Sequence, residues 1–159
     1  MTISVGERIP NVVMNEMGEE GPVELTSEAL FAGKKVVLFA LPGAFTPTCS
    51  KAHLPGFVAN ADKIRAKGVD DIVCLSVNDA WVMDAWGKDQ NAEEIHMVAD
   101  GSANFTQAVG LVLDRTAGGM GIRSQRYAMI VDDGVVTALN VEEPGKLEKS
   151  SAEAVLAQL

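Results

Sequence analysis

Residues 36–50 read VVLFALPGAFTPTCS, an apolar run that leads into a proline-bounded loop. Val36–Ala40 is short, apolar and rich in β-forming residues, which predicts a buried strand. Pro42-Gly43 ends this strand. Thr46-Pro47 is typical of a helix start, with threonine as the N-cap and proline at the first helical position. The stretch therefore predicts a buried strand, a tight loop and then a helix.

Strand and helix patterns alternate along the rest of the chain. The helix after Pro47 has apolar residues at helical spacing as far as Ile64, and Pro55-Gly56 is expected to kink or break it. Further strands are expected at 72–77, 97–99, 127–131 and 135–139, the last two joined by the hairpin signal Asp-Asp-Gly. Ala117–Gly121 is expected to be a flexible loop, and Ser150 and Glu153 a capping box before a last helix.

The resulting order, β-α-β-α-β-α-β-β-α, predicts an α/β protein with a thioredoxin-like fold. In this fold a central mixed sheet is flanked by helices. The 159 residues correspond to one domain, 1–159, and a hydrophobic content of 47% suffices for a buried core.

Composition excludes several classes of function. Thirteen basic against 22 acidic residues give a net charge of −9, so we expect no binding to nucleic acid or to anionic membranes. The start lacks the apolar core of a signal peptide, and no apolar run could span a bilayer, so a cytoplasmic protein is expected. Two cysteines and two histidines without a CxxC pair predict neither a disulfide scaffold nor a metal site.

Cys49 is the candidate nucleophile. If Thr46 is the N-cap, Cys49 occupies the third helical position, where free backbone N–H groups and the helix dipole favour a thiolate. The alternative is that Cys49 is a small buried apolar residue with no chemistry. Position alone leaves both interpretations open.

The residues around Cys49 form a pattern known from one family. Pro42-x-x-x-Thr46-x-x-Cys49 resembles the active-site motif of peroxiredoxins, and the run LPGAFTPTCSKAHLPGF at 41–57 resembles the peroxiredoxin 5 group, including plant type II and bacterial members. The similarity covers nearly the whole chain. It continues through these later segments: Cys74–Asp79, Trp86-Gly87, Ala99–Gly101, Arg123–Tyr127, Asp133-Gly134 and Asn140–Glu142.

This resemblance implies a thiol-dependent peroxidase that reduces hydrogen peroxide and small alkyl hydroperoxides in antioxidant defence. Cys49 would attack the peroxide and become a sulfenic acid. Thr46 would orient the substrate, Pro42 would shield the sulfur, and Arg126 would stabilise the thiolate and bind the peroxide.

Other assignments around the site stay open. Backbone N–H groups near Gly43 would bind the substrate, and Phe45 would line the pocket or a subunit contact. Arg123 is a rival for the role of Arg126. Thr46 could be only an N-cap, Pro42 only a strand end, and Arg126 only a surface residue.

The oxidised cysteine must then be reduced. Animal members of the group carry a resolving cysteine before the last helix, but residues 146–151 contain none. Cys74 is the possible resolving residue, although its apolar strand predicts burial. We therefore expect a one-cysteine cycle with an external thiol, either glutathione with or without glutaredoxin or else thioredoxin, and no bound cofactor. The resemblance also implies a homodimer.

Two other functions remain alternatives. A thiol hydrolase would need His53 or His96 to orient on Cys49. A redox sensor or holdase would oxidise the same thiol without turnover.

Overall fold

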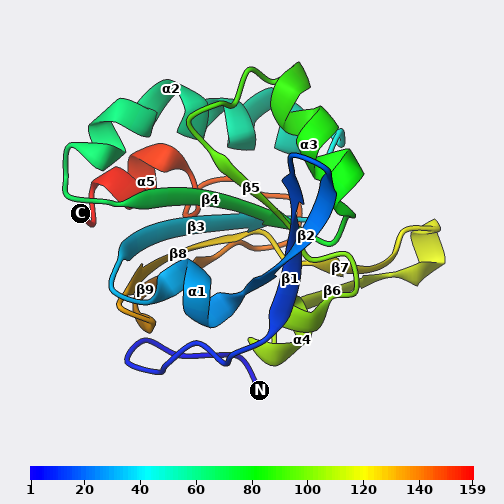
Figure 1. Cartoon of the computed structure of the whole chain (residues 1–159). Helices are drawn as coiled ribbons and strands as arrows, with labels where there is room; N and C mark the ends of the chain where they lie inside the picture. The colour runs from blue at the N-terminus through cyan, green and yellow to red at the C-terminus, as the bar shows by residue number, and fades with distance from the viewer.

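A seven-stranded mixed sheet forms the centre of the molecule, with strand order β2-β1-β5-β4-β3-β8-β9 (Figure 1). The computed structural model describes all residues, 1–159. Strands β3, β4 and β5 are parallel to one another, whereas β8 and β9 on one side and β1 and β2 on the other run antiparallel to their neighbours. The strands of this sheet are β1 Val13–Gly18, β2 Gly21–Thr26, β3 Lys35–Leu41, β4 Asp71–Ser76, β5 His96–Ala99, β8 Tyr127–Asp132 and β9 Val135–Val141.

Helices cover both faces of the sheet. Figure 1 shows α2, α3 and α5 above it and α1 and α4 below it. The bounds are α1 Ser27–Phe31, α2 Leu54–Arg65, α3 Ala80–Asp89, α4 Asn104–Ala108 and α5 Ala152–Leu156, with a π-helical turn, η1, at Cys49–His53. The structure thus confirms the predicted mixed sheet flanked by helices. No helix has the length and apolarity needed to cross a bilayer.

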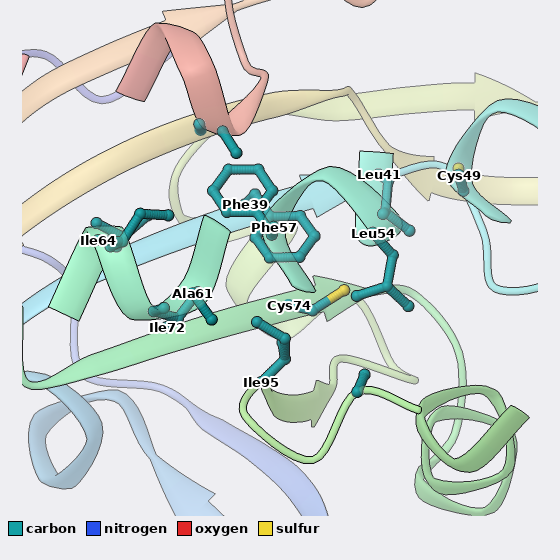
Figure 2. Close-up of a cluster of buried hydrophobic side chains, with 14 of the residues drawn as sticks. Phe39, Leu41, Cys49, Leu54, Phe57, Ala61, Ile64, Ile72, Cys74 and Ile95 are labelled. Carbon is teal, nitrogen blue, oxygen red and sulfur yellow. The ribbon is translucent and has the colours of Figure 1, made fainter. Parts of the chain in front are cut away.

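Strand β3 shows why both faces are covered. Its residues from Val36 to Leu41 are fully buried and alternate between two apolar clusters. Val37, Phe39 and Leu41 pack with α2, α3 and α5, whereas Val36 and Leu38 pack with α1 and α4. Successive side chains of a strand point to opposite faces, so an uninterrupted apolar run requires cover on both. Figure 2 shows Phe39 against Phe57 of α2, with ring centroids 3.9 Å apart.

The hairpin of β8 and β9 forms as predicted. Asp133 and Gly134 both have positive φ, at 47° and 81°, as its tight turn requires. The expected loop at Ala117–Gly121 is instead the end of a second hairpin. It is formed by β6 Val112–Arg115 and β7 Gly121–Ser124, with a 3-10 turn, η2, at Thr116–Gly118. Ser124 is the one buried residue in these two four-residue strands, so they carry no apolar pattern.

Candidate active site

The loop after β3 ends in a helix whose first turns are irregular. The helical run begins at Pro47, and the carbonyl of Thr46 accepts the first bond, from the Ser50 N–H at 3.0 Å. Cys49 is therefore the third helical residue, as predicted. From Cys49 the turn widens to π geometry, and the Leu54 N–H bonds to the Cys49 carbonyl. Such single π turns are frequent at functional sites.

The irregularity predicted at Pro55 lies just before it, and the helix does not break at the proline. Pro55 lies in the first turn of α2, directly after the π turn, and the helix continues to Arg65. The first turn of a helix tolerates proline because its N–H groups need no intrahelical partner. The irregularity therefore falls before the proline, at the turn that begins with Cys49.

Arg126 points its guanidinium at the Cys49 sulfur. It lies one residue before β8, which pairs with β3, so the strand register brings it next to the loop after β3. Its Nη2 donates to Cys49 Sγ at 3.1 Å. The rival Arg123 instead donates to the carbonyls of Met120 and Val77. Of the two arginines, the structure brings Arg126 to Cys49.

His53 is engaged by groups other than Cys49. Its Nε2 lies 2.9 Å from the Ser150 carbonyl, and its Nδ1 lies 2.7 Å from Arg126 Nη1. Burial, and then the charge of Arg126, lower the pKa of His53 to about 3, so the ring is neutral at pH 7. The other histidine, His96, binds Asp71 and Glu16. Neither forms the Cys–His pair that a thiol hydrolase would need.

Thr46 stands at the loop's last position. Its hydroxyl donates to the Gly43 carbonyl at 2.7 Å and does not cap the helix. Gly43 has little free space, because a Cβ there would lie 3.2 Å from both Arg123 Nη1 and Thr46 Cγ2. The N–H of Ala44 donates to the Asn78 side chain at 3.0 Å. The loop is thus held by a hydrogen bond within itself and by neighbours from two other segments, Asn78 and Arg123.

A cleft of about 510 Å³ opens over this loop. Its walls come from the loop, the β6–β7 hairpin, the segment before β8 and the segment after β9. The lining residues are Pro42, Thr46, Pro47, Thr48, Leu113, Arg115, Met120, Gln125, Arg126, Glu142, Glu143, Pro144 and Gly145. Pro42 and Thr46 of the loop therefore meet Arg126, which is distant in the sequence, at one cleft.

Cys49 and Phe45 lie outside this lining. Cys49 is buried, with 1% of its surface exposed, next to the cleft residue Arg126. Phe45 is 53% exposed and packs against Trp86 with ring centroids 6.4 Å apart. The structure therefore places Phe45 on the outer surface and not in the cleft.

Cys74 lies in β4, completely buried, as its apolar strand predicted. Figure 2 shows it among core side chains with Leu54 and Phe57, and Cys49 at the margin of the same cluster. Burial, and then the neighbouring Cys49, raise the pKa of the Cys74 thiol, so it stays protonated at neutral pH. Both cysteines are free thiols in this structure.

Glu142 and Ser150 are two residues near the site that no local sequence pattern indicates. Ser150 was assigned to a capping box, but the α5 N-cap is Ser151, whose hydroxyl accepts from the Ala154 N–H. Ser150 is instead buried and donates to the Glu142 carboxylate. No local pattern pairs residues this far apart. The one available signal was Glu142 in the segment that resembles the peroxiredoxin 5 group.

Comparisons with known proteins give matches over nearly the whole chain. The Redoxin family model matches residues 4–156. Peroxiredoxin-2E, chloroplastic, of Arabidopsis thaliana is 48% identical over 99% of this chain and 70% of its own length, and Peroxiredoxin-2D of the same plant is 46% identical over 99% and 98%. The crystal structure of reduced Prx3 in complex with H2O2 from Vibrio vulnificus superposes with a TM-score of 0.96, at 60% identity over 99% of each chain.

Proposed function

This chain belongs to the Redoxin family and is a peroxiredoxin, a thiol-dependent peroxidase with a thioredoxin-like fold, and from that premise we propose that Cys49 is its peroxide-reacting residue. The substrates proposed are hydrogen peroxide and small alkyl hydroperoxides. One observation carries the proposal. The Arg126 guanidinium donates to the Cys49 sulfur at 3.1 Å, beside a cleft, and a fixed positive charge favours a thiolate there.

The proposed reaction is a displacement at oxygen. The Cys49 thiolate attacks one peroxide oxygen, so that an S–O bond forms and the O–O bond breaks. Sulfur loses two electrons and becomes a sulfenic acid, in which the attacked oxygen keeps its hydrogen. The other oxygen takes a proton from solvent water and leaves as water or an alcohol. Negative charge grows on the leaving oxygen, and the Arg126 guanidinium is a donor next to that place.

Thr46 is proposed to orient the peroxide. Its hydroxyl proton points to the Gly43 carbonyl at 2.7 Å, which leaves the oxygen lone pairs free to accept from a peroxide O–H. Pro42 lines the same cleft and presents only apolar ring atoms, which supports its proposed role in shielding the sulfur.

We propose that an external thiol completes the cycle, namely glutathione with or without glutaredoxin, or thioredoxin. Two properties of Cys74 support this proposal. Its side chain has no exposed surface, and burial in the core raises the pKa of its thiol, which disfavours attack on a sulfenic acid. The open cleft beside Cys49 offers an external thiol an approach from solvent.

A homodimer is proposed as the assembled form. Trp81 on α3 is 65% exposed and Phe45 is 53% exposed, and Phe45 packs on the same helix through Trp86. Large exposed aromatic side chains are enriched at protein interfaces. A second copy would cover them. Sedimentation of Trp81→Glu should show monomers where the parent chain shows dimers, and a parent chain that sediments as a monomer contradicts this part.

Intact mass of the protein after one equivalent of hydrogen peroxide tests the chemistry. Cys74→Ser should gain about 16 Da as a sulfenic acid and then turn over with glutathione and glutaredoxin or with thioredoxin. Cys49→Ser, the matched control, should gain nothing. Loss of turnover in Cys74→Ser with every donor would make Cys74 the resolving residue. Oxidation of Cys49 without turnover in the parent chain would favour the redox sensor.

A further inference from the structure

Four residues from separate parts of the chain close a ring of hydrogen bonds behind the cleft. Arg126 Nη1 and His53 Nδ1 lie 2.7 Å apart, and His53 Nε2 lies 2.9 Å from the Ser150 carbonyl. The Ser150 N–H and hydroxyl both donate to Glu142 Oε2 at 2.7 Å. The Glu142 N–H then donates to the Arg126 carbonyl at 2.9 Å, which closes the ring.

Three of the four residues in the ring are buried, and the fourth, Arg126, is half-buried at the cleft. Ser150 has no exposed surface, His53 has 1% and Glu142 has 8%. Burial raises the pKa of the Glu142 carboxyl, but the hydrogen bonds from Ser150 and Glu148 outweigh it and lower the pKa overall. Glu142 is therefore a carboxylate at neutral pH. Its Oε2 accepts three bonds of 2.7 Å, from Ser150 twice and from the Glu148 N–H once.

The ring fixes the tautomer of His53. A backbone carbonyl can only accept, so the proton of the neutral imidazole must be on Nε2, facing Ser150. The Nδ1 lone pair then faces Arg126 Nη1. With Nη1 held in this way, the planar guanidinium has one orientation, and that orientation directs Nη2 at Cys49 Sγ.

We propose that Glu142 and Ser150 are positioning residues that act through His53 to aim the Arg126 guanidinium at the Cys49 sulfur. The C-terminal segment 142–150 thereby belongs to the reactive site, although none of its side chains contacts the thiol. This inference rests on the proposed reaction at Cys49. The rival interpretation is that Glu142 only attaches the segment before α5 to the sheet.

Nuclear magnetic resonance of the His53 ring nitrogens separates the two interpretations. In the parent chain the ring should be the Nε2–H tautomer and stay neutral down to pH 4, because its pKa is about 3. In Glu142→Ala the Ser150 carbonyl loses its fixed place. We expect mixed tautomers and a titration nearer the ordinary histidine value of about 6.5. Glu153→Ala removes an exposed carboxylate of α5 itself and should leave the His53 signals unchanged.

Two reactions of Cys49, each measured at the high-pH plateau where the thiol is fully ionised, give the second readout. Oxidation by hydrogen peroxide should slow by ~10- to 100-fold in Glu142→Ala, because a misplaced guanidinium no longer meets the leaving oxygen. Alkylation by iodoacetamide needs no such donor and should change by less than about threefold. Glu142→Gln keeps an acceptor for Ser150 and should recover most of the oxidation rate.

The proposal is overturned if a folded Glu142→Ala keeps the parent tautomer and oxidation rate. It is equally overturned if both reactions slow by the same factor, which would indicate general damage to the cleft. Should Glu142→Ala fail to fold, Ser150→Ala provides the test of the proposal. It removes one of the three donors to Glu142 and should shift the His53 signals in the same direction. The tautomer does not depend on peroxide, so it tests the ring even if Cys49 proves unreactive.

Discussion

The Arg126 guanidinium divides its two terminal nitrogens between Cys49 and His53, at 3.1 and 2.7 Å. A planar fork can make both bonds at once, whereas a lysine ammonium is a single point charge on a flexible stem. The side chain is therefore held from one end while it donates at the other. This explains why an arginine, and not merely a cation, suits the position.

Arg126→Lys should keep a positive charge near Cys49 but lose the fixed orientation of the donor toward the sulfur. We expect the second-order rate with hydrogen peroxide to fall by ~100-fold, the scale of one lost transition-state donor. Stopped-flow kinetics measure it. Arg123→Lys, which alters an arginine bonded to Met120 and Val77, should cost less than about tenfold. The reverse pattern would give the role to Arg123.

Thr46 allows a nearly isosteric test. Thr46→Val removes the hydroxyl that donates to Gly43 and should slow peroxide reduction by ~10- to 100-fold. Thr46→Ser keeps the hydroxyl and should stay within about fivefold of the parent rate. Steady-state turnover with saturating reductant checks both. Equal rates in the valine and serine variants would show that the hydroxyl has no part in the reaction.

The roles of single residues were predictable where a local pattern carried them. The threonine-proline pair predicted the helix start and placed Cys49 in its first turn, and the structure agrees. Arg126 was identified by resemblance alone, because strand register between β3 and β8 brings it to the site. Ser150 could not be found in this way. Its bond to His53 spans 97 residues, and no sequence period reports such a contact.

At the scale of elements, buried strands were the predictable part. Strands β3, β4 and β8 are apolar runs because helices cover both their faces. The N-terminal strands β1 and β2 were missed. They contain polar residues and a proline, and Met14 is the one fully buried side chain among them. Only β2 lies at the edge of the sheet, with β1 between it and β5. Strands with so few buried side chains are set by pairing with the sheet and not by their own pattern.

His96 of β5 links three adjacent inner strands, β1, β5 and β4, and gives this part of the sheet a pH dependence. Its Nδ1 contacts Asp71 of β4 at 2.7 Å, and its Nε2 contacts Glu16 of β1 at 2.8 Å. The hydrogen bond to Asp71 is the main cause that raises the pKa of His96, opposed by burial and assisted by Glu16. The protonated form therefore stabilises the folded state.

His96→Gln should lower the free energy of unfolding by about 2 kcal/mol at pH 6, the scale of hydrogen bonds to charged groups. Because the folded pKa lies above the unfolded value of about 6.5, the difference is complete below pH 6.5. It should shrink as pH rises through the folded pKa. Urea unfolding at pH 6 and pH 9 measures it. A difference that grows with pH would contradict the assignment.

Across the whole molecule, the two histidines act in opposite directions on stability. His53 is buried as a neutral ring with a pKa of about 3, so the unfolded chain binds its proton more readily than the folded one. Acid therefore favours unfolding through His53 and folding through His96. The site at Cys49 and the inner strands joined by His96 therefore have opposite pH responses.

Stability should accordingly fall by about 3 kcal/mol through His53 between pH 6.5 and pH 4. His53→Gln should be less stable than the parent chain at pH 7 and should lose this acid-dependent part. Urea unfolding of the parent, His53→Gln and His96→Gln across pH 4 to 8 isolates each contribution. A parent chain and a His53→Gln variant with parallel pH profiles would show that His53 is not held neutral.

The most direct test of the account is stopped-flow reaction of the fully reduced protein with hydrogen peroxide, followed by tryptophan fluorescence. Trp86 is a built-in reporter, because its indole N–H donates to Ser50, the neighbour of Cys49, at 3.1 Å. We expect a rate at least ~1000-fold above that of free cysteine at the same pH, retained in Cys74→Ser and abolished in Cys49→Ser. A parent rate equal to that of free cysteine, or a fast rate that survives in Cys49→Ser, would contradict it.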